Sequence, residues 1–153
     1  MRFLISCFSL IAWAHHGTHI LDKPLEDAPL RRITNTVSSN YIRDVKPIFE
    51  RKCGDCHGSP TSYPGYYRIP LIKQWIDHDI SEGHEHFDIS NGFPFGGHGS
   101  ITDNFKAIRD DIGEGRMPPW LYRLSHRNSG LNEEEKKIIS KWVTDSQALF
   151  GLK

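Results

Sequence analysis

Residues 53–57 read Cys53-Gly54-Asp55-Cys56-His57, and this stretch decides how the rest of the chain must fold. Two thiols separated by two residues can each add across a vinyl group of haem, and the histidine beside the second thiol can then ligate the iron. C-x-x-C-H is among the more specific short cysteine motifs and is typical of c-type haem attachment. The motif predicts one covalently bound haem c, attached through Cys53 and Cys56 and ligated by His57.

A close cysteine pair has two other common uses. A structural zinc site requires a second pair of cysteines or histidines at ligand spacing, and the later histidines of the chain leave that alternative open. A thioredoxin-like redox pair requires a preceding strand in a βαβ unit, and no such pattern is visible here. Haem attachment is therefore the interpretation that we adopt.

The beginning of the chain has the pattern of a secretory leader. An apolar stretch from Phe3 to Trp13 follows Met1-Arg2 and ends in the small-x-small sequence Ala12-Trp13-Ala14. We expect residues 1–14 to be a signal peptide cleaved after Ala14, which implies a periplasmic or otherwise exported protein. The stretch is too short to cross a bilayer, so no stable membrane span is expected. A lipoprotein-type cleavage site at Leu4-Ile5-Ser6-Cys7 is an alternative.

The cysteine count agrees with this interpretation. The chain holds three cysteines, and the first, Cys7, lies within the predicted leader. The mature chain would then hold only Cys53 and Cys56, which leaves no disulfide framework for an exported protein. The pair must serve another purpose.

Composition limits the class of protein. The chain has 153 residues with 19 basic and 19 acidic side chains, so its balanced charge gives no indication of a nucleic acid or acidic membrane partner. This length predicts one domain, which we place at residues 41–153. Only 37% of the residues are hydrophobic, which is thin for a self-sufficient core. A haem would supply the missing apolar bulk, so we expect the haem-free protein to be poorly folded.

Helical patterns dominate the part of the chain after residue 40. Residues 15–40 contain two prolines and a Thr/Ser/Asn run without a sustained period, which predicts an extended arm. Pro47 suits the first position of a short helix that leads into the cysteine motif. Apolar periodicity predicts further helices over residues 71–81 and 102–112, the second ended by Gly113 and Gly115.

The last helix has the clearest start signal. Asn132 followed three residues later by Glu135 forms an asparagine variant of the capping box, and an apolar stripe follows it. Strand signals are weak throughout. The patterns together predict an all-α fold.

Met117 is the candidate second iron ligand. It lies in the sequence Arg116-Met117-Pro118-Pro119-Trp120, where the two prolines fix an extended backbone and prevent a helix from continuing. A thioether held at a defined place can ligate haem iron. The alternative is that Met117 only packs in the core, as most methionines do.

These elements resemble the single-haem, class I-like c-type cytochromes, and in particular the bacterial family called the haem-binding domain, over about residues 44–143. The resemblance implies a cytochrome-c-like fold in which short helices and long loops wrap around one haem, with the first and last helices crossing beside it. It also implies His57 as the proximal ligand and Met117 as the distal ligand. It is carried by the segments Asp44-Val45, Cys53–Gly58, Tyr63-Pro64, Tyr66-Tyr67, Asp79–Gly83 with His86 and Ser90, Ile112–Pro119, and the helix from Leu131 to Trp142.

The histidines between the motif and Met117 leave the distal ligand open. Any one of them in place of Met117 would give a bis-histidine haem of lower potential. The Gly-rich insert at residues 91–100 departs from the family pattern, and one alternative is that it brings His98 near the iron. The candidates are His78, His84, His86 and His98, while His15, His16 and His19 near the mature N-terminus have no assigned role.

The predicted function is electron transfer to and from redox partner proteins in the periplasm. The chain shows no nucleophile–base constellation, so it predicts an electron carrier rather than an enzyme. A backbone carbonyl is expected to accept the ring N–H of His57, with Pro64 or Pro70 as candidates. Two alternatives stay open, a haem-based sensor of a small ligand and a haem-containing subunit of a peroxidase-type enzyme.

Overall fold

A computed structural model describes residues 28–60 and 62–152 of the chain. The predicted signal peptide and residues 15–27 of the predicted arm lie outside the described residues. No strand occurs within the described ranges, where Asp88 and Gly96 form an isolated bridge. The all-α prediction is confirmed. The elements in chain order are α1 (Ala28–Asn40), the π-helical turn η1 (Tyr41–Val45), α2 (Lys46–Lys52), α3 (Gly54–His57), the 3-10 turn η2 (Gly65–Arg68), α4 (Pro70–His86), α5 (Ile101–Glu114), α6 (Trp120–Ser125) and α7 (Glu133–Leu149).

The expectation of an extended arm over residues 15–40 is wrong from Ala28 onward, where the chain forms α1. Pro29 is the second residue of this helix, a position at which a missing N–H costs nothing. Ile33, Val37 and Tyr41 recur every four residues and lie on the face that packs against the core. The intervening Thr, Ser and Asn residues conceal this stripe in the sequence.

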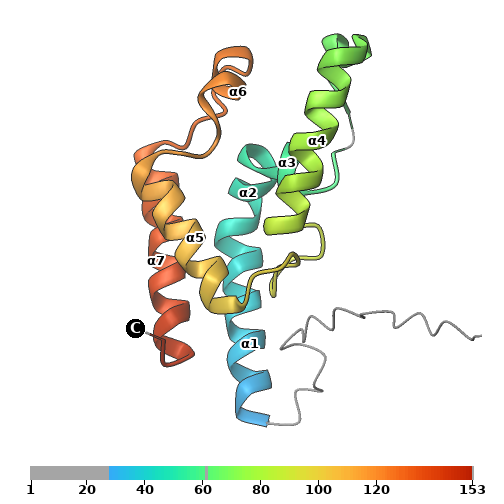
Figure 1. The fold of residues 1–153 in the computed structure, drawn as a ribbon. Helices are drawn as coiled ribbons and strands as arrows, with labels where there is room; N and C mark the ends of the chain where they lie inside the picture. The colour runs from blue at the N-terminus through green and yellow to red at the C-terminus, as the bar shows by residue number, and fades with distance from the viewer. Residues whose placement is uncertain (1–27, 61, 153) are drawn as a thin grey trace, which may run out of the picture.

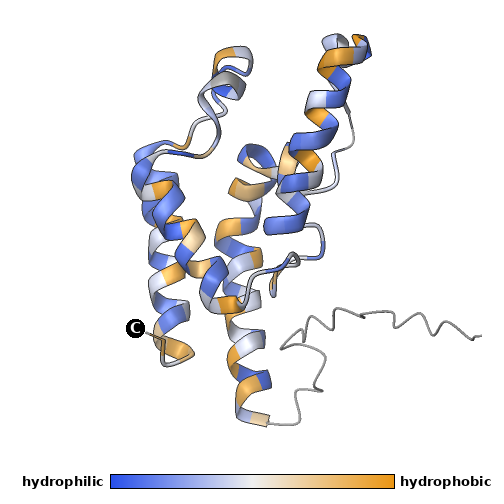
Figure 2. Cartoon of the chain, viewed as in Figure 1, coloured by the Kyte–Doolittle hydropathy of each residue, from blue (hydrophilic) through white to orange (hydrophobic). Residues whose placement is uncertain are grey.

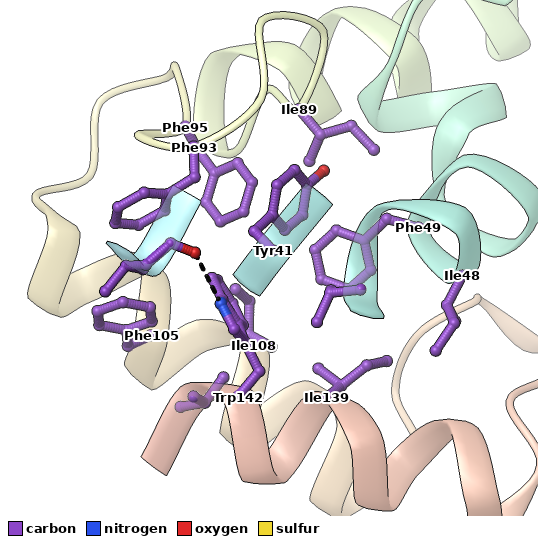
Figure 3. Packing of buried hydrophobic residues seen from close by; sticks show 13 residues of the cluster. Tyr41, Ile48, Phe49, Ile89, Phe93, Phe95, Phe105, Ile108, Ile139 and Trp142 are labelled. Carbon is purple, nitrogen blue, oxygen red and sulfur yellow. Dashed lines mark hydrogen bonds between the residues drawn. The ribbon is translucent and has the colours of Figure 1, made fainter. Parts of the chain in front are cut away.

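The buried core is largely aromatic (Figure 3). Tyr41 lies among Phe49, Phe95 and Trp142, with ring centroids 5.9, 5.1 and 5.6 Å away. The indole N–H of Trp142 donates a hydrogen bond of 3.3 Å to the carbonyl of Val37, which joins α7 to α1. The first and last helices therefore pack against each other, as the resemblance implies. The buried cluster comprises Val37, Tyr41, Val45, Ile48, Phe49, Ile89, Phe93, Phe95, Phe105, Ile108, Ile139, Trp142 and Val143.

Local signals set the helix ends. Pro47 is the second residue of α2, one place after the predicted first position. The predicted capping box of α7 is present, since Asn132 accepts from the Glu135 amide at 2.8 Å and Glu135 accepts from the Asn132 amide at 3.0 Å. Gly113 lies inside α5, whereas Gly115 ends it in a left-handed conformation with a φ of 65°.

Two parts of the chain extend away from this core (Figure 1). The η2–α4 arm (residues 63–75) contains η2 and the first turns of α4, and the linker–α6 arm (residues 115–126) follows α5. Both carry hydrophobic segments in Figure 2. None of the helices described is both long enough and apolar enough to cross a membrane.

Candidate functional site

The cysteine motif forms one helical turn at the end of α2. The Cys53 amide donates to the Phe49 carbonyl at 2.8 Å, and the His57 amide donates to the Cys53 carbonyl at 2.9 Å. This turn brings the two thiols and the imidazole together on a single short segment. Cys53 and Cys56 are free thiols and partly buried.

Both thiols lie in a poorly solvated environment. Burial raises the pKa of Cys53 to about 12, and the nearby charges of Cys56 and Glu135 act in the same direction. Burial, followed by the charges of Asp55 and Asp79, also raises the pKa of Cys56. Neither group is therefore an activated thiolate, which is the state that a redox cysteine pair would need.

The imidazole of His57 is held by backbone oxygens. Its Nδ1 lies 2.8 Å from the carbonyl oxygen of Phe87 and 3.2 Å from that of Gly83. A carbonyl oxygen can only accept a hydrogen bond, so Nδ1 must carry the proton. The opposite nitrogen, Nε2, then has a free lone pair that can ligate a metal.

The partner of His57 differs from the predicted one. We expected the carbonyl of Pro64 or Pro70, and that expectation is wrong, because the end of α4 supplies Phe87 and Gly83 instead. Helix α4 approaches the motif this closely because residue 83 is glycine. A Cβ atom there would lie 2.7 Å from the Cys56 carbonyl oxygen and 3.4 Å from the His57 Nδ1.

The histidines near the end of α4 lie behind His57. The two ring nitrogens of an imidazole point in different directions, so the α4 segment that contacts Nδ1 lies away from the side that Nε2 faces. His84 donates from Nε2 to the Gly58 carbonyl at 2.6 Å. His86 lies 3.8 Å from Glu82, and His98 lies 3.6 Å from Glu85. This geometry disfavours all three as distal ligands, while His78 is exposed on α4.

The Gly-rich insert at residues 91–100 belongs to the core. Phe93 and Phe95 are buried, with 7% and 3% exposure. The His98 amide donates to the Glu85 carbonyl at 2.9 Å, which ties the insert to α4. The insert is therefore packed on the core and against α4, and His98 lies beside Glu85 of that helix.

Met117 lies in the linker between α5 and α6. Its side chain is 41% exposed, and the following Pro118 is buried. Arg116 anchors the start of the linker by donating to Asp111 at 2.7 Å, and it also pairs with Glu114. The Met117 side chain is thus not packed in the core, and the ends of its linker are held in place. Both features suit a residue that ligates a metal.

The linker–α6 arm is joined to the motif by side chains that the sequence reasoning missed. The Tyr122 hydroxyl lies 2.5 Å from the carboxylate of Asp55, inside the C-x-x-C segment. The Tyr122 ring stacks on His126 with a centroid distance of 4.0 Å, and His126 Nε2 lies 3.1 Å from the Tyr66 hydroxyl. Burial raises the pKa of Tyr122, and the hydrogen bond to Asp55 raises it further. No sequence spacing signals these contacts, because Asp55 and Tyr122 are far apart in the chain.

The two arms carry most of the exposed large hydrophobic side chains of the described residues. Leu71 is 78% exposed, Leu124 75% and Trp120 69%. Such a surface fits a large, flat, apolar group placed between protein segments, as a porphyrin is. With the two thiols and the free Nε2, the residues present fit a covalently attached haem. The exposed hydrophobic side chains are Tyr63, Tyr66, Ile69, Leu71 and Trp75 on the η2–α4 arm and Met117, Trp120 and Leu124 on the linker–α6 arm.

Other metal sites find little support in the described ranges. No three His, Cys, Asp or Glu side chains among residues 28–60 and 62–152 converge in a way that could hold a metal ion. The zinc alternative for the cysteine pair therefore has no ligand set in this part of the chain.

Comparisons with known proteins agree with this geometry. The model of a family described as "Haem-binding domain" matches residues 21–145, more than half of the chain. Cytochrome c peroxidase Ccp of Escherichia coli (strain K12) is 26% identical over 108 residues, which cover 66% of this chain and 22% of that protein. The chain thus spans less than a quarter of the length of this relative. No solved structure matches.

Proposed function

The chain belongs to the haem-binding domain family, and from this we propose that it is an electron-transfer protein with one haem c and with His57 and Met117 as axial ligands. Cys53 and Cys56 would attach the haem through thioether bonds. When bound, the haem supplies a centre that accepts and releases one electron. The chain's task is then to bind the cofactor, fix its ligands and exclude water.

The observation that carries the proposal is the state of His57 within the motif. Its Nδ1–H donates a hydrogen bond to the Phe87 carbonyl, which fixes the tautomer that leaves the lone pair on Nε2. A ring N–H donated to a carbonyl also raises the basicity of the ligating nitrogen and holds the ring in one orientation. Both effects suit a permanent axial ligand.

Met117 suits the opposite axial position. A pair of neutral protein ligands keeps the iron coordinated in both oxidation states, and a Met/His pair raises the reduction potential relative to two histidines. The exposed thioether of Met117 and the fixed ends of its linker support this assignment. The hydrophobic residues of the two arms would cover the faces of the porphyrin and reduce the access of water.

We also propose that the protein acts in the periplasm or in another exported location. The apolar stretch from Phe3 to Trp13 and the cleavage pattern ending at Ala14 support this placement. The partners would be other redox proteins that exchange electrons at an exposed haem edge. In this proposal the chain is a carrier without a catalytic site of its own.

Absorption spectroscopy of the purified pigmented protein tests the proposal. A pyridine haemochrome assay should report one haem per chain with two thioether bonds, and acidified acetone should not extract it. A colourless exported protein, or a pigment that acidified acetone removes, would show that no covalent haem is present. The ferric protein should also show the weak far-red band of methionine-ligated iron.

Replacing Met117 tests the distal ligand. Met117→Ala should abolish the far-red band, lower the reduction potential and allow carbon monoxide to bind the ferrous iron rapidly. Leu149→Ala removes a side chain of similar exposure, 43% against 41%, at the far end of α7 and should change none of these. An unchanged spectrum in Met117→Ala would remove Met117 from the site.

A second candidate function is a haem-containing subunit or domain of a peroxidase-type enzyme. The similarity to cytochrome c peroxidase Ccp favours it. Steady-state oxidation of an electron donor by hydrogen peroxide, measured with the purified holoprotein, separates the two functions. Turnover well above that of free haem would favour the peroxidase, whereas fast electron exchange without peroxide turnover would favour the carrier.

A further inference from the structure

Helix α6 contributes none of its described side chains to the buried core cluster. Trp120 and Leu124 are 69% and 75% exposed, and Tyr122 is partly buried. The helix spans six residues, too few to be stable without tertiary contacts. Polar contacts of its described residues join it to the rest of the molecule.

Those contacts converge on the haem-attachment motif. Tyr122 donates to Asp55, which lies between Cys53 and Cys56, with a distance of 2.5 Å. His126, stacked against the Tyr122 ring at an interplanar angle of 12°, meets the Tyr66 hydroxyl of the η2–α4 arm. Both nitrogens of His126 are engaged, since its Nδ1 lies 3.1 Å from the Tyr122 carbonyl. We call Asp55, Tyr122, His126 and Tyr66 the clasp.

The clasp is mechanically connected to Met117. The Arg123 amide donates to the Pro119 carbonyl at 3.0 Å, so the turn that carries Tyr122 begins directly after the Met117-Pro118-Pro119 segment. At the other end of this segment, Arg116 is bound to Asp111 of α5. Any outward movement of α6 would therefore leave Met117 with a single anchor.

We propose that the hydrogen bond from Tyr122 to Asp55 acts as a positioning contact that keeps Met117 bound to the iron. This inference rests on the His57–Met117 ligation proposed above. Release of the clasp would raise the fraction of protein in which the distal iron position is open. Tyr122 and Asp55 would then control how readily an outside ligand replaces Met117.

The strength of the Tyr122–Asp55 hydrogen bond sets how much the fraction of open protein should change. A hydrogen bond to a charged acceptor is worth about 1.5–3 kcal/mol, and the exposure of Asp55 places this one near the lower end, which is a factor of about 10 in an equilibrium constant. The apparent affinity of a ligand that needs the open state scales with the fraction of open protein. Imidazole should therefore bind about tenfold more tightly once the bond is lost.

The experiment is an imidazole titration of the ferric holoprotein, followed by the loss of the far-red methionine band. Tyr122→Phe keeps the ring and its stacking on His126 but removes the hydroxyl, and Asp55→Asn removes the charge of the acceptor. Tyr67→Phe is the matched control, because the Tyr67 hydroxyl also donates to a carboxylate, that of Asp77 at 2.5 Å, but this bond joins η2 to α4. A haemochrome assay and a thermal melt confirm that each variant is loaded and folded.

We expect the apparent dissociation constant for imidazole to fall about tenfold in Tyr122→Phe and by a smaller factor in Asp55→Asn, whose amide oxygen still accepts a neutral hydrogen bond. The double variant should match Tyr122→Phe. Tyr67→Phe should match the parent. If the parent shows the methionine band and Tyr122→Phe binds imidazole as the parent does, the clasp proposal is wrong while the ligation stands. If the parent lacks the band altogether, the ligation is wrong, and the clasp proposal is overturned with it.

Discussion

The Nδ1 atom of His57 lies 2.8 Å from the carbonyl oxygen of Phe87, at the point where α4 ends. This contact joins the haem motif to a helix that begins thirteen residues after it. For this hydrogen bond to form, the end of α4 must lie close to the motif. The distance between the two segments is set by Gly83, where no side chain intervenes.

Gly83→Ala should disturb the site through this approach. The new Cβ would lie 2.7 Å from the Cys56 carbonyl oxygen, and that backbone cannot move aside without shifting the motif. We expect the free energy of unfolding of the holoprotein to fall by about 1–3 kcal/mol, as overpacking usually costs. Denaturant unfolding followed by circular dichroism measures the loss.

Gly113→Ala is the matched control for this change. Gly113 is also helical, but a Cβ there would meet no atom within 4 Å. Alanine is the better helix former, so stability should stay the same or rise by up to about 1 kcal/mol. Equal losses in both variants would mean that the close approach of α4 to the motif is not the cause.

The second prediction concerns the haem-free protein, for which the structure revises the expectation drawn from composition. The 37% hydrophobic content predicts a poorly folded apoprotein, yet among the side chains that the structure describes the buried cluster draws none from η2, α4 or α6. We therefore expect the Cys53→Ala/Cys56→Ala variant to keep a cooperative thermal transition and the near-ultraviolet signal of its aromatic core, at a lower midpoint than the holoprotein. Only the two arms should become sensitive to protease.

Limited proteolysis and circular dichroism of the same sample decide this question. Cleavage confined to residues 63–75 and 115–126 would agree with a core that folds by itself. A gradual melt without an aromatic signal would instead show that the haem is needed for the whole fold, as the composition alone suggests.

The α5 capping box provides a prediction on pH. The hydroxyl and backbone amide of Ser100 donate to the Asp103 carboxylate at 2.7 and 3.0 Å and hold the pKa of Asp103 below its ordinary value. Because the folded pKa is the lower one, the box stabilises α5 above the unfolded value of about 3.9, and this stabilisation is lost as the pH falls through the folded pKa.

Ser100→Ala should therefore raise the pKa of Asp103 toward its ordinary value. A pH titration by nuclear magnetic resonance, carried out on the diamagnetic ferrous protein, measures it directly. Glu133 of α7, whose pKa is lowered by Lys136 of the same helix, serves as the control and should titrate unchanged. No change at Asp103 would mean that the Ser100 hydroxyl does not hold the carboxylate.

Local chemistry explains which parts of this protein the sequence predicts. The haem motif and the Asn132–Glu135 box each lie within five consecutive residues, so their geometry follows from spacing alone. Helix α1 escaped prediction because Ile33, Val37 and Tyr41 are separated by polar residues of low helix propensity, and tertiary packing overrides that preference.

The contacts that complete the site are of another kind. The Phe87 carbonyl that orients His57 is a backbone group, which any residue type would supply, so it leaves no trace in the sequence. The Tyr122–Asp55 bond joins side chains that are 67 residues apart, and only the fold brings them together. His126 was not predicted either, because the histidines considered as iron ligands lie between the motif and Met117.

The last prediction concerns the Gly-rich insert, which sequence reasoning could not place. Phe95 is 3% exposed and lies among the rings of Tyr41, Phe87 and Phe93, with centroids 5.1, 4.8 and 5.5 Å away. Phe95→Ala should lower the free energy of unfolding by about 3–5 kcal/mol, the usual cost of deleting a buried aromatic ring. Urea unfolding of the holoprotein, followed by far-ultraviolet circular dichroism, measures this change.

His98→Ala, in the same insert, separates packing from ligation. The His98 side chain is 67% exposed and lies beside Glu85 on α4, so its loss should change stability by no more than about 0.5 kcal/mol. The haem spectrum should also be unchanged. A lost or shifted haem band in His98→Ala would mean that this histidine contacts the iron. A Phe95→Ala variant as stable as the parent would mean that the insert is not part of the core.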